Sequence, residues 1–315
     1  MLLIFGRVLG IFLLIFVGLI AYKVGVFNED SKNHLTKLLL YITAPCMAAY
    51  SIYSKEISPE LMSSTIQVLI VQSLYFVVMV AFGYFVVRLL NFKPRAQWGV
   101  YIASMVAINN GFMGYPVTKA VFGDDIFYLM VMINIPSCIF FYAIMPVVMR
   151  IGRETTDTSW WSNIKQAINP AMTGIAIGVI FLLLGIQPPE DVNIIVKYLS
   201  DATIPLSMII VGVQLGTSHL KEVIKNKYVA ITSFVAMFVV PVVVLLLVHF
   251  LPFLNNDVKL IIIFSSIFPT AVVTAAISHQ QGIEGNRAAE IVSITTAISL
   301  VTIPLSAAML SYLYL

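Results

Sequence analysis

Two asparagines, two glycines and a proline interrupt the middle of a long apolar segment at about residues 97–121. They lie in the run Asn109-Asn110-Gly111-Phe112-Met113-Gly114-Tyr115-Pro116. Asparagine and glycine favour turns, and proline removes a backbone donor and clashes with the preceding helical turn. A helix interrupted inside a membrane leaves backbone groups that only other protein or a watered cavity can satisfy. The run is therefore a candidate binding site. The alternative is a kinked structural helix, because proline and glycine are common in membrane spans.

A second interruption is predicted in the apolar segment at about residues 258–280, where Pro269 is followed by Thr270 and Thr274. Their hydroxyl groups both donate and accept hydrogen bonds. Asn110 precedes Gly123 by the same number of residues as Pro269 precedes Gly282, so the two breaks lie at matching depth counted from the end of each segment.

The composition is that of a membrane protein. The chain has 315 residues, of which 60% are hydrophobic and 10% are charged, and its mean hydropathy is +0.96. Soluble domains carry about 25% charged residues. Repeated apolar runs of helical length predict an all-α polytopic protein, and the short alternating segments of a membrane barrel are absent. The net charge of +3 does not indicate nucleic acid as a partner, because the basic residues lie in short loops.

The apolar runs predict ten transmembrane helices, five in each half of the chain. They cover about residues 3–24, 34–53, 62–90, 97–121, 126–149, 165–186, 193–216, 227–250, 258–280 and 287–313. A polar cytoplasmic loop at 151–164 separates the halves 1–150 and 165–315. Because five is odd, the second half must be inserted upside down relative to the first. Interrupted helices at corresponding places of an inverted repeat point to a transporter site near the bilayer midplane.

The basic residues predict the orientation. Thirteen of the 18 Lys and Arg residues lie at the loops that follow spans one, three, five, seven and nine. Loops rich in Lys and Arg stay in the cytoplasm. We therefore expect a multi-pass protein of the cell membrane, in contact with its lipids, with both termini extracellular.

Several motifs along the whole chain resemble those of the auxin efflux carrier family. They are Gly18-Leu19-Ile20-Ala21-Tyr22-Lys23-Val24-Gly25-Val26, Thr43-Ala44-Pro45, Asn110-Gly111-Phe112-Met113-Gly114-Tyr115-Pro116, Asn169-Pro170 and Phe268-Pro269-Thr270-Ala271. The short central loop is similar to that of the bacterial members. The family includes plant auxin exporters and bacterial carriers of malonate, malate and similar acids.

The resemblance implies a fold and a mechanism. Spans four and nine would break and cross near the bilayer centre beside the substrate. Spans one, two, six and seven would form a scaffold domain, through which the protein would form a homodimer. Spans three to five and eight to ten would form a moving transport domain. Plant members keep a charged pair on span three, where this chain has Gln67 and Gln72.

The proposed chemistry is recognition of an anion without a buried cation. The N-terminus of a helix carries free N–H groups and about half a positive charge, which attract anions. The predicted substrate-binding residues are Asn109, Asn110, Gly111, Gly114, Pro116, Asn134, Pro269, Thr270 and Thr274. For the polar members the alternative role is hydrogen bonding between helices.

Four residues are candidates for coupling transport to H⁺ or Na⁺. Asp201 is ionisable within a span, His279 titrates near neutral pH, and Gln67 and Gln72 are polar residues of span three. The alternatives are that Asp201 lies at the membrane interface and that His279 is a solvated helix end.

We therefore predict a secondary active or facilitative carrier of small organic anions that works by an elevator-type movement. The alternative is a channel or a ligand-sensing receptor for small anions. The chain contains no H-E-x-x-H, G-x-S-x-G or G-x-x-x-x-G-K-[ST] motif, so neither an enzyme nor an ATP-driven pump is expected. No catalytic residues, metal site or cofactor are predicted.

Overall fold

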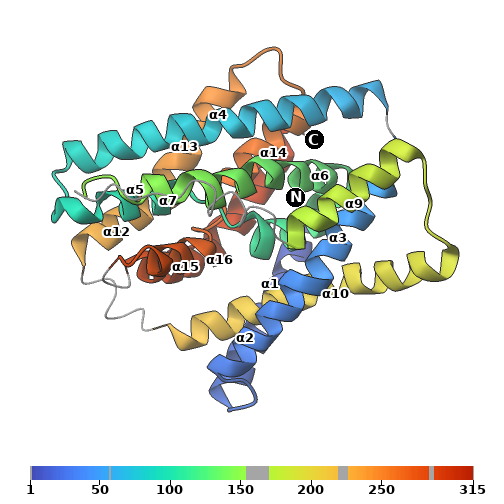
Figure 1. The fold of residues 1–315 in the computed structure, drawn as a ribbon, viewed down its shortest axis with the longest axis horizontal. Helices are drawn as coiled ribbons and strands as arrows, with labels where there is room; N and C mark the ends of the chain where they lie inside the picture. Colours follow the sequence, from blue (N-terminus) through green and yellow to red (C-terminus); the bar gives the residue numbers. More distant parts are fainter. Residues whose placement is uncertain (1, 57, 154–169, 219–225, 284–286, 315) are drawn as a thin grey trace. The chain divides into compact units, whose positions relative to one another are not determined.

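The computed structural model describes residues 2–56, 58–153, 170–218, 226–283 and 287–314 (Figure 1). All regular elements of these residues are helices. The chain forms two compact units. Unit 1 comprises Met1–Ile66, Gly111–Ile135 and Ile168–Ser218, and unit 2 comprises Gln67–Asn110, Pro136–Ala167 and His219–Leu315. Each unit draws on both predicted halves of the chain, and the halves themselves stay a prediction.

Unit 1 is held together by close helix packing. Its helices are α1 (Leu2–Lys23), α2 (Glu29–Leu38), η1 (Leu39–Thr43), α3 (Ala44–Tyr53), α9 (Pro170–Leu184) and α10 (Glu190–Thr217). Helix α1 packs along α10, and α3 packs against α9. A Cβ atom on Gly18 would lie 2.1 Å from the carbonyl oxygen of Ile209, and one on Gly212 would lie 2.0 Å from that of Ile15. Small residues let the two backbones approach, as is typical of membrane helices.

The substitution Gly18→Ala is expected to destabilise the protein by about 1–3 kcal/mol, because the added methyl group overlaps the Ile209 backbone. Gly10→Ala on the same helix is the matched control, since a Cβ there meets nothing within 4 Å. Alanine at an open helical site is neutral or stabilising by about 0.5–1 kcal/mol. Thermal unfolding of the detergent-solubilised variants measures both effects. Equal melting temperatures for the two variants would contradict the packing described.

Unit 2 surrounds the interrupted segments. Its elements are η2 (Arg95–Gln97), α5 (Trp98–Val106), η4 (Phe140–Ile144), α7 (Met145–Val148), α12 (Lys227–Phe234), η5 (Val235–Val239), α13 (Val240–His249), α14 (Asn256–Ser266), α15 (Val273–Gln280) and α16 (Arg287–Tyr314). Helices α4 (Pro59–Leu89) and α6 (Tyr115–Ile139) each contribute residues to both units. Helix α16 packs against α5, α12, α14 and α15 and so supports both breaks.

Four wide π-helical turns each end two residues before a proline. They are η1, η3 (Asn110–Gly114), η4 and η5, followed by Pro45, Pro116, Pro146 and Pro241 respectively. Proline has no N–H group, and its ring clashes with the carbonyl four residues earlier in a regular helix. A wide turn before the proline removes that clash. Ala44-Pro45 and Tyr115-Pro116 are therefore placed at helix starts rather than helix interiors.

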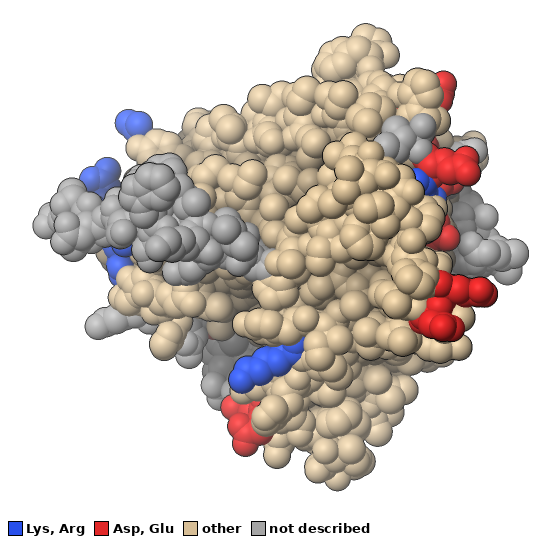
Figure 2. Space-filling model, turned by 45° about the vertical axis from the view of Figure 1, so that its right-hand side comes forward, with Lys and Arg blue, Asp and Glu red and all other residues tan. Residues whose placement is uncertain are grey.

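Six helical stretches of the described residues are long and apolar enough to cross a membrane. They are Glu29–Tyr53, Pro59–Leu89, Asn110–Val148, Glu190–Thr217, Lys227–His249 and Arg287–Tyr314, and Leu9–Lys23 and Pro170–Leu184 are shorter apolar helices. Uncharged residues make up most of the face seen in Figure 2, and many large apolar side chains are exposed. The protein is thus a multi-pass helical membrane protein, as predicted.

The ten predicted spans and the observed helices differ at the boundaries. Helix α6 runs through the predicted end of span four and the start of span five, but Gly123 breaks it with φ 80° and ψ −168°. This is the left-handed side of the backbone map that glycine adopts without strain. The predicted loop 151–164 lies outside the described residues from 154 onward.

Candidate functional site

The first interruption lies between α5 and η3. Helix α5 ends at Val106, and Ala107 takes an extended conformation with ψ 115°. The wide turn η3 begins at Asn110, and α6 resumes at Tyr115. The break thus lies where Asn109 and Asn110 predict it.

The second interruption lies between α14 and α15. Helix α14 ends at Ser266 and α15 begins at Val273, so Pro269 and Thr270 lie in non-helical chain. Thr274 is the second residue of α15.

The two interruptions are bonded to each other within unit 2. Ile108 and Thr270 form an antiparallel bridge. The N–H group of Asn109 donates to the carbonyl of Pro269 at 2.9 Å, and that of Ala271 donates to the carbonyl of Ala107 at 3.0 Å. Each break therefore satisfies backbone groups of the other, which meets the requirement for irregular chain inside a membrane.

Side chains from neighbouring segments stabilise this contact. The Thr270 hydroxyl donates to the carbonyl of Ser104 at 2.8 Å, and the Thr270 N–H donates to the Thr295 hydroxyl at 3.2 Å. The Tyr75 hydroxyl of α4 donates to the carbonyl of Val106 at 3.2 Å. Helices α4, α5 and α16 are thereby joined to the breaks by buried hydrogen bonds.

Several backbone N–H groups at the breaks, which the sequence predicts to be bare, already have acceptors. Besides Asn109 and Ala271, the N–H of Asn110 donates to Ile108 at 3.0 Å and that of Thr274 donates to Ala271 at 3.0 Å. The antiparallel bridge and tight turns use these donors before a ligand arrives. These N–H groups are therefore already bonded within the protein.

Several buried side-chain atoms next to the breaks have no hydrogen-bond partner among the described residues. They are Asn110 Oδ1, Ser104 Oγ, Thr274 Oγ1 and both amide atoms of Gln72. All four side chains are at most 1% exposed. Gln72 precedes Tyr75 by three residues in α4, so the two lie on one helix face. A buried polar group without a partner costs about 1–3 kcal/mol, so a polar ligand that pairs with these atoms recovers that energy.

The remaining predicted residues lie in different surroundings. Gly111 and Gly114 belong to η3, Pro116 is the second residue of α6, and Asn134 is a buried residue of α6 in unit 1. The amide oxygen of Gln67 accepts from the N–H of Asn255 at 3.1 Å.

The two charged coupling candidates are at least partly exposed. His279 is an exposed residue in the last turn of α15. Asp201 is 47% exposed and lies 2.7 Å from Lys197 and 3.7 Å from Lys119. This geometry fits an ion pair at the membrane interface, and a coupling role for either residue stays a prediction.

Sequence reasoning missed the partners of the break. Ser104, Thr295 and Tyr75 are polar residues within apolar helices, and Ser137 accepts a hydrogen bond from Asn110 Nδ2 at 3.3 Å. Serine and threonine are common inside membrane helices, where they bond to their own backbone. Their residue types alone therefore do not distinguish them from other serines and threonines.

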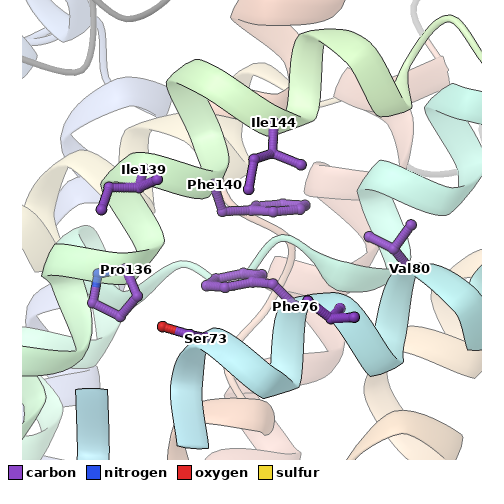
Figure 3. A pocket seen from close by; sticks show the side chains of 8 residues that line it. Ser73, Phe76, Val80, Pro136, Ile139, Phe140 and Ile144 are labelled. Atoms are coloured by element: carbon purple, nitrogen blue, oxygen red, sulfur yellow. The ribbon is translucent and has the colours of Figure 1, made fainter. Parts of the chain in front are cut away.

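An apolar cavity of about 430 Å³ lies in unit 2 between α4 and the segment Pro136–Ile144 (Figure 3). The rings of Phe76 and Phe140 stack at 4.2 Å between centroids. The one hydroxyl of its lining, that of Ser73, already donates to Leu69. The cavity is unsuited to an anion. In the part of the chain that is described, no three His, Cys, Asp or Glu side chains gather as a metal site.

A family profile described as "Membrane transport protein" matches the chain twice, over residues 3–160 and 156–307. An "Uncharacterized transporter" of Methanothermobacter thermautotrophicus is 23% identical over 300 residues, which covers 95% of both chains. The "Uncharacterized transporter MJ1031" of Methanocaldococcus jannaschii is 24% identical over 304 residues, which covers 95% of this chain and 96% of the relative. The similarity thus extends over nearly the full length of both relatives.

Proposed function

We propose that this chain, which belongs to the membrane transport protein family, carries small organic anions across the cell membrane. The resemblance to auxin efflux carriers noted in the sequence agrees with this family. Transport is secondary active or facilitative. The substrate class is that of malonate, malate and auxin-like carboxylates.

One observation carries the proposal: unpartnered polar atoms are buried beside the contact between the two interruptions. Asn110, Ser104, Thr274 and Gln72 offer hydroxyl and amide groups there. The hydroxyls of Ser104 and Thr274 and the amide nitrogen of Gln72 are unpartnered donors from which a carboxylate can accept. Asn110, whose unpartnered atom is its amide oxygen, donates through Nδ2. A neutral site of this kind binds an anion without a buried Lys or Arg, so the anion leaves again at little electrostatic cost.

The movement proposed is that of an elevator. Ten spans in two inverted halves, with broken and crossing spans four and nine, would hold the substrate while spans three to five and eight to ten move past a scaffold. The two profile matches, one in each half, support a repeat. We also propose that both termini are extracellular and that the scaffold spans form a homodimer.

Uptake of radiolabelled malonate into proteoliposomes tests the proposal. We expect saturable uptake that unlabelled malonate inside the vesicles accelerates, with a turnover far below channel rates. Parallel assays with a pH gradient, with a sodium gradient and with neither identify the coupling ion. Flux that rises linearly with malonate concentration would favour the channel, and binding without flux would favour the receptor.

A further inference from the structure

A polar cavity of about 230 Å³ lies within unit 1, where the end of α3 faces α6. Lys55, Lys119, Ser51 and Phe127 are among the residues that line it. The residues at this end of α3 and beside Gly123 belong to the side predicted to be extracellular. Lys55, Lys119 and the nearby Lys197 are three of the five basic residues predicted on that side.

The Lys119 ammonium group lies within ion-pairing distance of two carboxylates but has no hydrogen-bond acceptor among the described residues. Its side chain is only 18% exposed. Its Nζ atom lies 3.7 Å from Asp201 and 4.0 Å from Asp124, both beyond hydrogen-bonding distance, and 5.6 Å from the centre of the Phe127 ring. An ammonium group has three N–H donors. Among the described residues none of these donors has a hydrogen-bond acceptor, so the cavity holds a cation that is ion-paired at 3.7 and 4.0 Å but has unused N–H donors.

Ser51 adds a second unsatisfied donor to the cavity. Its side chain is 7% exposed, it lines the cavity, and its hydroxyl has no partner among the described residues. Lys55 lies on the same cavity with 18% of its side chain exposed and makes one bond, of 2.5 Å, to Asp125. Asp125 itself is 86% exposed, and such a solvated pair contributes little binding energy.

We propose that this cavity is a second anion site, in which Lys119, Lys55 and the Ser51 hydroxyl bind the carboxylate of a small organic acid. The proposal rests on the proposed function, since it makes the cavity a waiting site for the transported anion at the predicted outer mouth. Three carboxylates compete for the lysines: Asp124, which also lines the cavity, Asp125 and Asp201. Their side chains are 72%, 86% and 47% exposed, so water screens them and the competition is weak. The carboxylate bridges the two ammonium groups, and the Phe127 ring lies against its apolar part.

Malonate is the probe for the test. In proteoliposomes, Lys119→Gln is expected to raise the KM for malonate by about tenfold, because it removes a charge-assisted hydrogen bond, and to change the maximal rate by less than about twofold. Lys119→Arg keeps the charge and is expected to retain most of the affinity. Lys197→Gln is the matched control: Lys197 also pairs with Asp201 but does not line the cavity. Its KM is expected to stay within about twofold of that of the unmodified protein.

Calorimetric binding to the purified Asn110→Ala protein separates this site from the proposed transport site. That variant is expected to keep a weak malonate site. Adding Lys119→Gln or Ser51→Ala to it is expected to remove this site. Phosphate and chloride at equal ionic strength are expected to bind there less tightly than malonate. Absence of malonate binding to Asn110→Ala, or an unchanged KM in Lys119→Gln, overturns the second site. Failure of the proposed function gives a different result. Neither the unmodified protein nor any variant would then transport malonate, but malonate binding to Asn110→Ala and its loss on adding Lys119→Gln would still be measurable.

Discussion

Asn110→Ala is expected to reduce malonate transport by about 10- to 100-fold while the protein stays folded. Asn110 starts the wide turn that follows the first break and is only 1% exposed. Its Nδ2 group has two N–H donors, of which one donates to the Ser137 hydroxyl. A hydrogen bond to a charged ligand contributes about 1.5–3 kcal/mol, which corresponds to that loss. Initial uptake rates and the melting temperature are measured on the same preparation.

Ser137→Ala is the matched control for this prediction. It removes the 3.3 Å bond from Asn110 Nδ2 to the Ser137 hydroxyl and leaves the Asn110 side chain in place. If Asn110 serves only to join helices, the two variants should lose equal activity. If Asn110 binds the substrate, the Ser137→Ala variant should retain most of the transport activity. Wild-type uptake by Asn110→Ala would exclude the residue from the site.

Thr270→Val is expected to destabilise the protein by about 1–3 kcal/mol and to abolish most transport. Valine keeps the shape of threonine but leaves the buried carbonyl of Ser104 without the hydroxyl that donates to it at 2.8 Å. That bond joins the second break to α5, so its loss disturbs the position of both breaks. Thermal unfolding and uptake are the measurements.

Thr296→Val is the matched control for Thr270→Val. Thr296 is 1% exposed and its hydroxyl donates at 2.6 Å to Val292, one turn earlier in the same helix. Such a bond within one helix adds little stability. Equal melting temperatures and equal uptake for the two variants would mean that the hydrogen bond from Thr270 to the carbonyl of Ser104 is unimportant.

The positions of both breaks could be predicted from the sequence because the residues there fit helices poorly. Asn109, Asn110 and Pro269 each favour a turn or remove a helical hydrogen bond. The gap between the predicted spans 97–121 and 126–149 contains Gly123, which has φ 80°, a value that glycine adopts without strain.

The hydrogen bonds between the breaks could not be predicted from the sequence. Pairing of Ile108 with Thr270 joins residues far apart in the chain, and its register depends on the packing of α5, α14 and α16. That pairing consumes the N–H groups that a helix terminus viewed alone would leave free. The side-chain groups of Thr274 and Gln72, by contrast, have no partner among the described residues.

The ion pair of Asp201 with Lys197 could be predicted from the spacing of the two residues in the sequence. Lys197 lies four residues earlier, so both side chains project from one face of α10 and form an ion pair. An apolar run around an acidic residue suggested membrane depth, whereas the structure shows Asp201 47% exposed and paired with Lys197. The lysine one helical turn before it was the signal for this arrangement.

The most direct test of the central claim is a crystal structure of the protein with bromomalonate, with anomalous scattering used to locate the bromine. The account predicts a bromine peak beside the paired breaks, with the ligand carboxylate within hydrogen-bonding distance of Asn110 and Thr274. A structure in which bromomalonate occupies only the cavity of Lys119, or in which the paired breaks stay empty at saturating ligand, would contradict it.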